Sequence, residues 1–545
     1  MQRASQLFTD THARLGGCMF SSRSLRRTPA ALATLLCASA AHAQLTDQTQ
    51  TPNAEGAGIF KSLEQQIGAG VGNVMTPNSS TYIIARDPAR SIRRGRQLFQ
   101  RKFTLTQGFG PRTLDGIGDI EAQGAIGAGL IESCAGCHGR PRGSAGFGGD
   151  VVTRPDSRDA PHLFGLGLQE MLADEITTDL RAIRARAISD ARRLRRSVTL
   201  SLNSKGISYG SIRAFSDGRV DTAGVRGVNT DLRVRPFFAQ GGTVSIREFV
   251  VGAFNDEMGL QAVDPLTTQA RAGGRVVTPT GMVLDGSTDL VQGPLATGPN
   301  DDNDRDGKVN EIPTALVDHM EFYLFNYFKP GTYRQTSLAS SGRTLMRQIG
   351  CTGCHIQDLV INRDRRVADV ETEYDPQNGL FNDMFATAAL LVSENDDGSG
   401  HPTVKTPLRG QFVVRNFFAD MKRHDLGPNF YERNYNGMLE KQFMTEPLWG
   451  VGSSPPYGHD GRSINLREVI LRHGGEAQAS RNAFASLSEN SKIAILEFLN
   501  SLVLFPPDDT ASNLDGGDPN ASGFPQRGHG SIKLTVLFND PTDQE

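Results

Sequence analysis

Two copies of the pattern Cys-x-x-Cys-His place the strongest constraint on what this chain can fold into. They read Cys134-Ala-Gly-Cys137-His138 and Cys351-Thr-Gly-Cys354-His355. Two cysteines three positions apart can form thioether bonds to both vinyl groups of one porphyrin, and the next histidine then lies under the iron as its proximal ligand. We therefore predict two covalently bound c-type haems, one at each motif.

Two other uses of these four cysteines compete with haem attachment. A zinc ribbon needs cysteine pairs that are close in sequence, but more than 200 residues separate the two pairs. Structural disulfides form in oxidising compartments, yet a two-residue loop is tight for a bridge that only holds structure. Neither alternative requires a histidine directly after both pairs, so haem attachment is the favoured interpretation.

The amino-terminal segment has the three parts of a secretory signal. Arginines precede a short apolar run over residues 30–40, and Ala41-His42-Ala43 has the small-x-small form of a cleavage site. We predict a signal peptide over residues 1–43 and a periplasmic or secreted protein. Met19 would begin a signal of ordinary length, which would leave residues 1–18 upstream of the start. The apolar run is too short to cross a bilayer, so no stable membrane span is expected.

Composition excludes several classes of protein. The 545 residues are 38% hydrophobic and 21% charged, with a mean hydropathy of −0.35, which excludes a multi-span membrane protein. The 28 Phe provide ample material for an apolar core. The formal net charge of −3 gives no electrostatic attraction to a nucleic-acid partner, and none is expected.

The sequence around the first haem motif is repeated around the second. Gly95–Phe99 precedes the first motif, and Gly342–Met346 precedes the second. The longest match pairs Pro236–Glu248 with Pro456–Glu468 at a constant offset of 220. Because the matches keep the same order around both motifs, they predict a duplicated haem domain.

The two copies differ at positions where a haem ligand could lie. At the offset of 220, His459 and His473 of the second copy correspond to Ala239 and Ala253 of the first. One of these histidines could be the sixth ligand of the second haem iron, although both could instead be structural or surface residues. A six-coordinate haem transfers electrons, whereas a five-coordinate haem binds O2 or peroxide. One closed and one open haem would form a redox enzyme with an internal relay.

The stretch Phe443–Ala477, together with Asp159–Leu172, Ser245–Leu260 and both haem motifs, resembles a known family. It is the di-haem oxidoreductase family, whose members are described as peroxidases or thiol oxidoreductases and are related to bacterial di-haem cytochrome c peroxidases. The resemblance spans residues 90–505 approximately. It implies a di-haem cytochrome c oxidoreductase of peroxidase type.

The resemblance also implies roles for two residues. In the peroxidases, the residue fourteen positions after the histidine of the Pro-Tyr-x-His-Asp-Gly motif ligates the second haem. Counting from His459 leads to His473, which would give a bis-histidine haem where the family uses Met. The family's catalytic Glu, which precedes a Met on the distal side of the first haem, corresponds to Glu257. Such a carboxylate can take a proton from peroxide and return it to the leaving oxygen.

Three departures from the peroxidase pattern point to an apolar distal pocket. Phe249 stands where a Gln assists the catalytic Glu, and Phe238 stands where a Trp lies between the haems. Residues 139–157 contain no His that could serve as a switchable distal ligand. These features resemble the rubber-oxygenase branch of the superfamily. We interpret Trp449, the only tryptophan, as core packing, with a haem-edge contact as the alternative.

An acidic loop lies between the two haem domains. In Asp302-Asn-Asp304-Arg-Asp306-Gly307, carboxylates at alternate positions with glycine at the sixth match the first half of a Ca²⁺ loop. Pro313 occupies the twelfth position, so the full EF-hand pattern is absent. A shorter calcium loop that uses Asn310 or Glu311 is our hypothesis, and an acidic solvated turn is the alternative.

We predict a mainly α fold with two cytochrome c-like haem domains in tandem, a small β-hairpin insertion over Val198–Val234 and long loops. Leu168–Arg196 lacks Gly and Pro and predicts a helix. The predicted order of segments is a signal peptide (1–43), an N-terminal extension (44–88), a first haem c domain with the β insertion (89–300), the calcium-type loop with a linker helix (301–334), a second haem c domain (335–505) and a flexible C-terminal tail (506–545).

Together these observations predict an exported enzyme that reduces peroxide at the first haem, on His138, with Glu257 as acid and base. The second haem, on His355 and His473, would relay electrons from a small periplasmic donor of cytochrome c or cupredoxin type. One rival is a haem-dependent oxygenase that acts on an apolar substrate with O2 and needs no external electrons. The other is a non-catalytic electron carrier with two six-coordinate haems.

Overall fold

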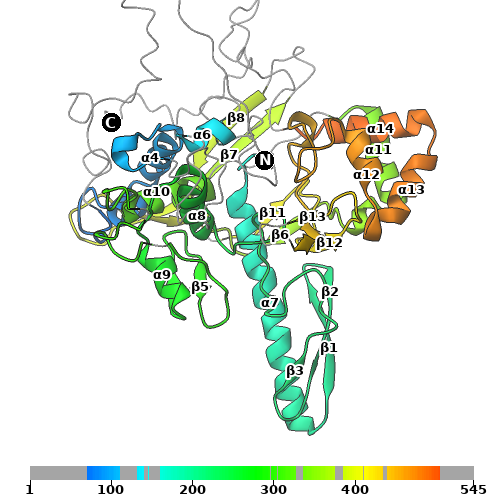
Figure 1. The fold of residues 1–545 in the computed structure, drawn as a ribbon, viewed down its shortest axis with the longest axis horizontal. Coiled ribbons are helices and arrows are strands. Elements are labelled where there is room, and N and C mark those ends of the chain that lie inside the picture. Colours follow the sequence, from blue (N-terminus) through cyan, green and yellow to red (C-terminus); the bar gives the residue numbers. More distant parts are fainter. Residues whose placement is uncertain are drawn as a thin grey trace, which may run out of the picture. The chain divides into compact units, whose positions relative to one another are not determined.

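The computed structural model describes residues 70–110, 132–139, 145, 160–294, 296–303, 305–326, 335–374, 384–408, 410–433 and 438–503 (Figure 1). The predicted signal peptide, Asp304 and the predicted C-terminal tail lie outside these residues. Within these ranges, every helix is too short or too polar to cross a membrane.

The prediction of a mainly α fold is wrong, because the described residues combine helices with several small antiparallel sheets, at 39% helix and 16% strand. The eleven described helices are α3 (Ser80–Arg86), α4 (Pro88–Gln100), α6 (Cys134–His138), α7 (Leu166–Leu194), α8 (Ile246–Met258), α9 (Pro265–Arg271), α10 (Thr314–Asn326), α11 (Ser337–Gln348), α12 (Leu466–Arg472), α13 (Gln478–Ser486) and α14 (Glu489–Asn500).

The described strands form one three-stranded sheet and six two-stranded sheets. The three-stranded sheet contains β1 (Val198–Ser204), β2 (Ile207–Ala214) and β3 (Val220–Asp221). The two-stranded sheets pair β4 (Arg275–Val277) with β5 (Val283–Asp285), β6 (Leu359–Ile361) with β11 (Phe412–Val414), β7 (Ala368–Tyr374) with β8 (Met384–Leu390), β9 (Val392–Asn395) with β10 (Val404–Pro407), β12 (Arg423–Asp425) with β15 (Gln442–Met444), and β13 (Glu432–Arg433) with β14 (Leu439–Glu440).

Most of the strands missed by sequence analysis lie within residues 359–444. Apart from the seven-residue strands β7 and β8, these strands have two to four residues, which gives too few positions for an alternating pattern to be recognised. Two of the pairings also join distant segments, since β6 pairs with β11 about 50 residues later and β12 pairs with β15 across the β13–β14 hairpin. Tertiary contacts therefore decide these two pairings.

The repeated segments Gly95–Phe99 and Gly342–Met346 occupy equivalent places in two helix pairs. The first lies on α4, which packs against α10, and the second lies on α11, which packs against α14. A Cβ atom added at Gly95 would lie 2.2 Å from the carbonyl oxygen of His319 on α10. At Gly342 it would lie 1.8 Å from the carbonyl oxygen of Ala494 on α14. Glycine is required at both crossings because the two backbones touch.

The matched segments before α8 and α12 also share their backbone geometry. Phe237 and Thr243 form an isolated antiparallel bridge, and so do Tyr457 and Ser463, at the offset of 220. The next elements begin with equivalent side-chain caps, since Ser245 accepts a hydrogen bond from the third residue of α8 and Asn465 does so for α12. The repeat read from the sequence is thus a repeat of local structure.

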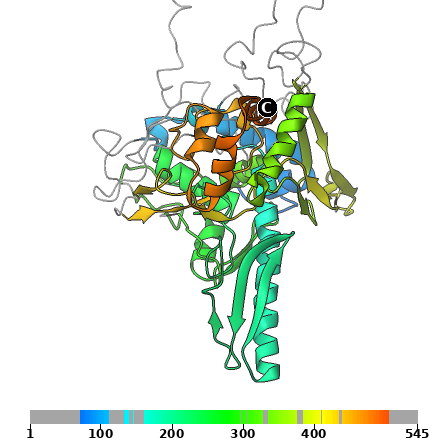
Figure 2. The same ribbon diagram turned by 90° about the vertical axis from the view of Figure 1, so that its right-hand side faces the viewer.

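A long helix with a small sheet forms an arm that we define as residues 181–226 (Figures 1 and 2). Where the sequence predicts a hairpin, the structure has the three strands β1, β2 and β3, and the predicted helix is present as α7. Ala187 and Ala191 on α7 are fully buried, as are Leu202 on β1 and Ile212 on β2. These apolar side chains hold the sheet against the C-terminal half of α7.

Candidate haem sites

The first Cys-x-x-Cys-His motif forms the short helix α6 and lies at the C-terminal end of α8. The Cys134 sulfur is 3.9 Å from the Met258 sulfur. Burial raises the pKa of the Cys134 thiol to about 12. Burial and then the Glu257 carboxylate raise that of Cys137 to about 11. The fold therefore brings Glu257, predicted as the catalytic acid and base, to the first haem motif.

Each of the three predicted histidine ligands is oriented by a hydrogen bond to a backbone carbonyl. The Nδ1 atoms of His138 and His355 lie 2.7 Å from the Pro161 carbonyl oxygen and 2.8 Å from that of Phe418. The Nδ1 atom of His473 lies 2.7 Å from the Val469 carbonyl oxygen.

A carbonyl oxygen can only accept, so Nδ1 carries the proton in all three rings and the lone pair is on Nε2. This is the tautomer that a haem iron requires of an Nε2 ligand.

The electrostatic surroundings keep these histidines neutral. Burial lowers the pKa of His138 to about 4, against the opposing effect of its bond to Pro161. Burial likewise lowers the pKa of His355 to about 4 and also lowers that of His473. Electrostatic interaction with the His473 imidazole contributes to the lowered pKa of His355, so the two rings are close in space. Neutral imidazoles with free Nε2 atoms fit the axial positions of a haem.

The cysteines fit haem attachment as well. The structure describes Cys134, Cys137, Cys351 and Cys354, and all four are free thiols. Burial raises the pKa of Cys351 to about 11, as it does for the cysteines of the first motif. Neutral sulfurs beside apolar space suit thioether bonds to a porphyrin, whereas a structural zinc site would need thiolates gathered around one point.

One face of α8 is accessible and is aligned with the first motif. Phe249, Ala253 and Glu257 are spaced by four residues, so they lie along one stripe of the helix. All three are half-buried, whereas the opposite face of α8 is buried. The Phe238 ring, which is 46% exposed, packs against Phe249 with 5.4 Å between ring centroids. The stripe is an apolar wall that ends in a single carboxylate beside Cys137.

Of the two histidines of the second copy that replace alanines, His473 interacts electrostatically with His355 of the second motif. His459 stacks on Phe443 with 4.0 Å between ring centroids, and its Nε2 atom is 3.0 Å from a Glu432 carboxylate oxygen. His473 is the C-cap of α12, one residue after Arg472. The position of Ala253, its counterpart, lies inside α8, which continues to Met258.

A continuous set of contacts joins the two motifs through Trp449. His162, which follows Pro161, donates from Nε2 to the Trp449 carbonyl oxygen at 3.1 Å. The Trp449 ring packs edge-on against Phe417 with 5.1 Å between centroids. Phe418, the next residue, accepts the hydrogen bond from His355. Trp449 is only 2% exposed, so it is the packing residue that the sequence predicts and also a bridge between the two motifs.

An ion cluster beside the second motif was not predicted from the sequence. The His424 ring lies between Asp420 and Glu476, with 2.8 Å from Nε2 and from Nδ1 to their respective oxygens. Burial lowers the pKa of His424, but the interactions with Asp420, Cys354 and Glu476 together outweigh burial, and the pKa rises to about 10. Cys354, Asp420 and His424 form the one group with metal-ligand spacing within the described ranges. A protonated imidazole cannot ligate a metal, so we interpret the cluster as an ion triad.

The described part of the predicted calcium loop uses its carboxylates internally. Asp302 accepts hydrogen bonds from the backbone amides of Asp306 and Gly307, both at 3.0 Å. Asp306 accepts one from Lys308 at 2.6 Å. Asp304 is outside the described residues, and calcium binding by this loop, with Asn310 as a further ligand, stays a prediction.

Comparison with known families agrees with this reading of the site. Residues 357–502 match a family described as "Di-haem oxidoreductase, putative peroxidase". The resemblance inferred from the sequence is therefore confirmed over this segment, which contains His473. This match supports a haem oxidoreductase.

Comparisons with solved structures and with curated proteins give no further information about function. Hydrazine synthase from Kuenenia stuttgartiensis, in a structure pressurised with xenon, is 15% identical with a TM-score of 0.21. The alignment covers 34% of this chain and 55% of that chain. At this level of similarity it carries no argument about fold or chemistry. No curated protein matches the chain.

Proposed function

We propose that the protein is an exported di-haem c-type oxidoreductase that reduces peroxide at the first motif with electrons relayed through the second. The observation that carries this proposal is the accessible stripe of α8. It has Ala253 where the second copy has His473, and it ends with Glu257 beside Cys137. A small side chain at that point leaves space for a diatomic ligand, and a carboxylate at the end of the stripe can move a proton.

The residues of the chain have distinct roles in this reaction. Covalently bound haem would supply a redox-active iron at each motif, held by His138 at the first and by His355 and His473 at the second. Glu257 would accept the proton from one peroxide oxygen and deliver it to the other as the O–O bond breaks. Two electrons and two further protons then convert one H2O2 into two water molecules. A small periplasmic cytochrome c or cupredoxin would supply the electrons.

A second candidate function is supported by the two aromatic rings on the stripe. Phe238 and Phe249 form an apolar wall at the position where the peroxidases carry polar or redox-active side chains. Such a wall would hold an apolar substrate next to bound O2 and would exclude water. A haem-dependent oxygenase of the rubber-oxygenase type is therefore the alternative, and it would need no external electron donor.

The two functions are separated by spectroscopy and by a pair of matched variants. In the ferric holoprotein we expect one high-spin and one low-spin EPR signal, and peroxide should remove the high-spin signal. Glu257→Gln should lower peroxide turnover by about a hundredfold or more, because it removes general acid–base catalysis. Asp256→Asn is the control, since Asp256 is an exposed carboxylate next to Glu257 on α8.

Two outcomes would count against the proposal. Two low-spin signals that do not respond to peroxide would leave an electron carrier. Oxygen uptake with a polyisoprene substrate in the absence of any electron donor, together with slow peroxide turnover, would favour the oxygenase.

The proposal also includes Ca²⁺. It would bind in the loop that contains Asp302 and Asp306, where it would fix the linker between the repeats. If the loop binds calcium, a chelator should lower the thermal unfolding temperature of the holoprotein, and added Ca²⁺ should restore it. No change in either direction would leave the loop as an acidic turn.

A further inference from the structure

The arm has a positive net charge, whereas the remaining residues of the chain have a negative net charge. Residues 181–226 contain eleven Lys or Arg and three Asp or Glu, a net charge of +8. The whole chain has a formal net charge of −3, so the remaining residues together carry −11. A separation of this size gives the molecule a strong electrostatic orientation in front of any charged surface.

Six exposed arginines gather at one end of the arm, where α7 ends and β2 turns into β3. We call this group the arm tip, and its residues are Arg192, Arg193, Arg195, Arg196, Arg213 and Arg219. The guanidinium groups of Arg213 and Arg219 both stack on Phe215, 5.1 Å from the ring centroid. Arg213 also donates to Ser197 at 3.1 Å, which links the sheet to the end of α7.

Few carboxylates neutralise the arm tip. Asp190 pairs with Arg193 at 2.8 Å, and Asp217 pairs with Arg219 at 2.6 Å. The arginine side chains of these pairs are 66% and 76% exposed. Pairs this exposed contribute little to stability, so the arginines remain free to exchange partners.

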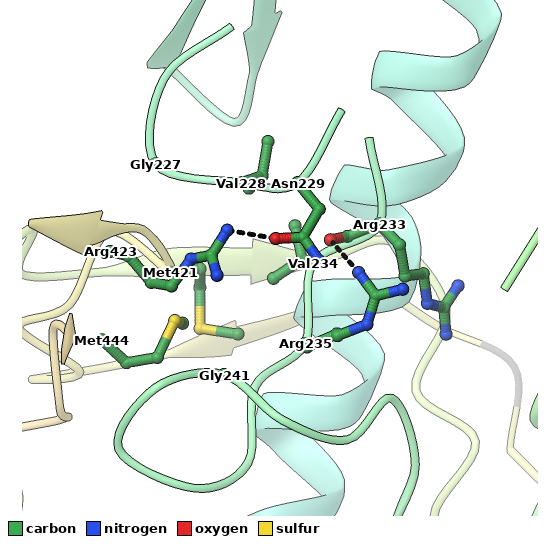
Figure 3. Close-up of a pocket in the computed structure, with 10 residues that line it drawn as sticks. All are labelled: Gly227, Val228, Asn229, Arg233, Val234, Arg235, Gly241, Met421, Arg423 and Met444. Carbon is green, nitrogen blue, oxygen red and sulfur yellow. Dashed lines mark hydrogen bonds between the residues drawn. The ribbon is translucent and has the colours of Figure 1, made fainter. Parts of the chain in front are cut away.

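The arm tip differs from the arginine cluster at the base of the arm, which is shown in Figure 3. There Arg233, Arg235 and Arg423 line a cavity with room for about one water molecule at most. Arg233 is paired with Asp174, Arg235 is paired with Asp231, and Arg423 donates to Asn229. Each arginine of the basal cluster therefore has a partner within the protein, whereas the guanidinium groups of the tip face solvent.

We propose that the arm tip docks on an anionic phospholipid surface. Guanidinium groups match phosphate oxygens with two parallel hydrogen bonds, and a row of headgroups can serve several arginines on different elements at once. The acidic remainder of the chain is repelled by the same surface. The protein would therefore bind through the arm and hold its haem motifs away from the lipid.

Vesicle sedimentation of the holoprotein tests this proposal. We expect binding to phosphatidylcholine vesicles that contain phosphatidylglycerol, none to pure phosphatidylcholine, and release at high salt. The variant Arg192→Gln, Arg193→Gln, Arg196→Gln should partition on the order of a hundredfold more weakly, given the usual contribution of each basic residue near an anionic surface. The control Arg347→Gln, Arg363→Gln, Arg415→Gln removes three exposed charges elsewhere and should bind like the parent.

Three results would overturn the proposal. The first is equal binding to both kinds of vesicle, and the second is unchanged binding of the tip variant. The third is failure to bind the anionic vesicles combined with tight retention on immobilised polyglutamate, which would point to an acidic protein partner instead. Unchanged haem absorbance and circular dichroism in both triple variants would show that they are folded.

Discussion

Helices α8 and α12 begin alike and end differently. Each follows an antiparallel bridge at the same offset, and each is capped by a side chain. In each helix, a glutamate carboxylate also accepts a hydrogen bond from the backbone amide two residues before the helix begins. Val244 donates to Glu248 at 2.8 Å, and Ile464 donates to Glu468 at 3.1 Å. Beyond this start, α12 stops at Arg472 and presents His473, whereas α8 continues through Ala253 to Met258.

The two helices also differ in how firmly they are held. Arg247 of α8 is fully buried and contacts Asp264, Asp318 and Glu321 at 2.6 to 2.8 Å. Burial lowers its pKa, but the three carboxylates outweigh burial and raise it. Its counterpart Arg467 pairs with the exposed Glu489 at 2.8 Å. The two equivalent helices therefore differ in their anchoring: α8 is held by a buried ion network, whereas α12 has an exposed ion pair at the same position.

The largest expected effect comes from exchanging the side chains at the two equivalent positions, His473 and Ala253. His473→Ala should convert the second haem from low spin to high spin, because its sixth ligand is lost. Ala253→His should do the reverse at the first haem and abolish peroxide turnover. EPR of the two ferric variants measures both changes. An unchanged spectrum in His473→Ala would remove this histidine as the ligand.

The next effect concerns the buried ion network of Arg247 on α8. Arg247→Met leaves three carboxylates buried without a cation, and we expect the free energy of unfolding to fall by about 3–5 kcal/mol. Arg467→Met should cost no more than about 1 kcal/mol, because that pair is exposed. Urea denaturation followed by circular dichroism compares the two variants. Similar losses would show that the two arginines do not differ as the structure indicates.

A smaller effect is expected from the ion triad beside the second motif. The pKa of His424 is raised from 6.5 to about 10 in the folded protein. Its contribution to stability is therefore complete below pH 6.5 and is lost as the pH rises through about 10. The Glu476 side chain is 53% exposed, which screens part of the interaction.

His424→Gln should remove this decline of stability at alkaline pH. The measurement is the urea midpoint of the parent and of the variant across this pH range. Parallel curves for the two proteins would contradict the assignment of the charge to His424.

The smallest expected effect tests the bridge between the motifs. Trp449→Phe keeps an aromatic ring against Phe417 but removes the indole, so electron flow from donor to peroxide should slow. The direct reaction of the pre-reduced protein with peroxide should stay close to that of the parent. Stopped-flow absorbance separates the two steps, and equal slowing of both would indicate general damage to packing.

Sequence analysis is most informative where features lie in short local patterns. The offset of 220 is confirmed as a repeat of local structure, whereas haem attachment at the two motifs and the role of His473 stay predictions. The long helix α7 was also predicted to within two residues at each end, since Leu168–Arg196 lacks any helix breaker.

Features that depend on distant contacts were missed. His424 belongs to no motif, and its partners Asp420 and Glu476 come together only in the fold. The buried network of Arg247 joins α8 to α10 and to a loop more than fifteen residues away. The small sheets of residues 359–444 made the predicted fold class wrong. Two of them, β6–β11 and β12–β15, pair over long separations, which leaves little trace in local sequence. Most of the other strands in this range are short.

The part of α8 that extends beyond the equivalent of α12 places acidic side chains at the C-terminal end of a helix. Backbone carbonyls give a helix a partial negative charge at its C-terminal end, and an acidic side chain there is disfavoured by about 0.3–1 kcal/mol. The last turn of α12 follows this preference with Arg472, whereas the last turn of α8 carries both Asp256 and Glu257 against it. Of these two carboxylates, Glu257 is half-buried and acts on Cys137. Local stability would not select a carboxylate there, and such positions are where function is expected to override folding.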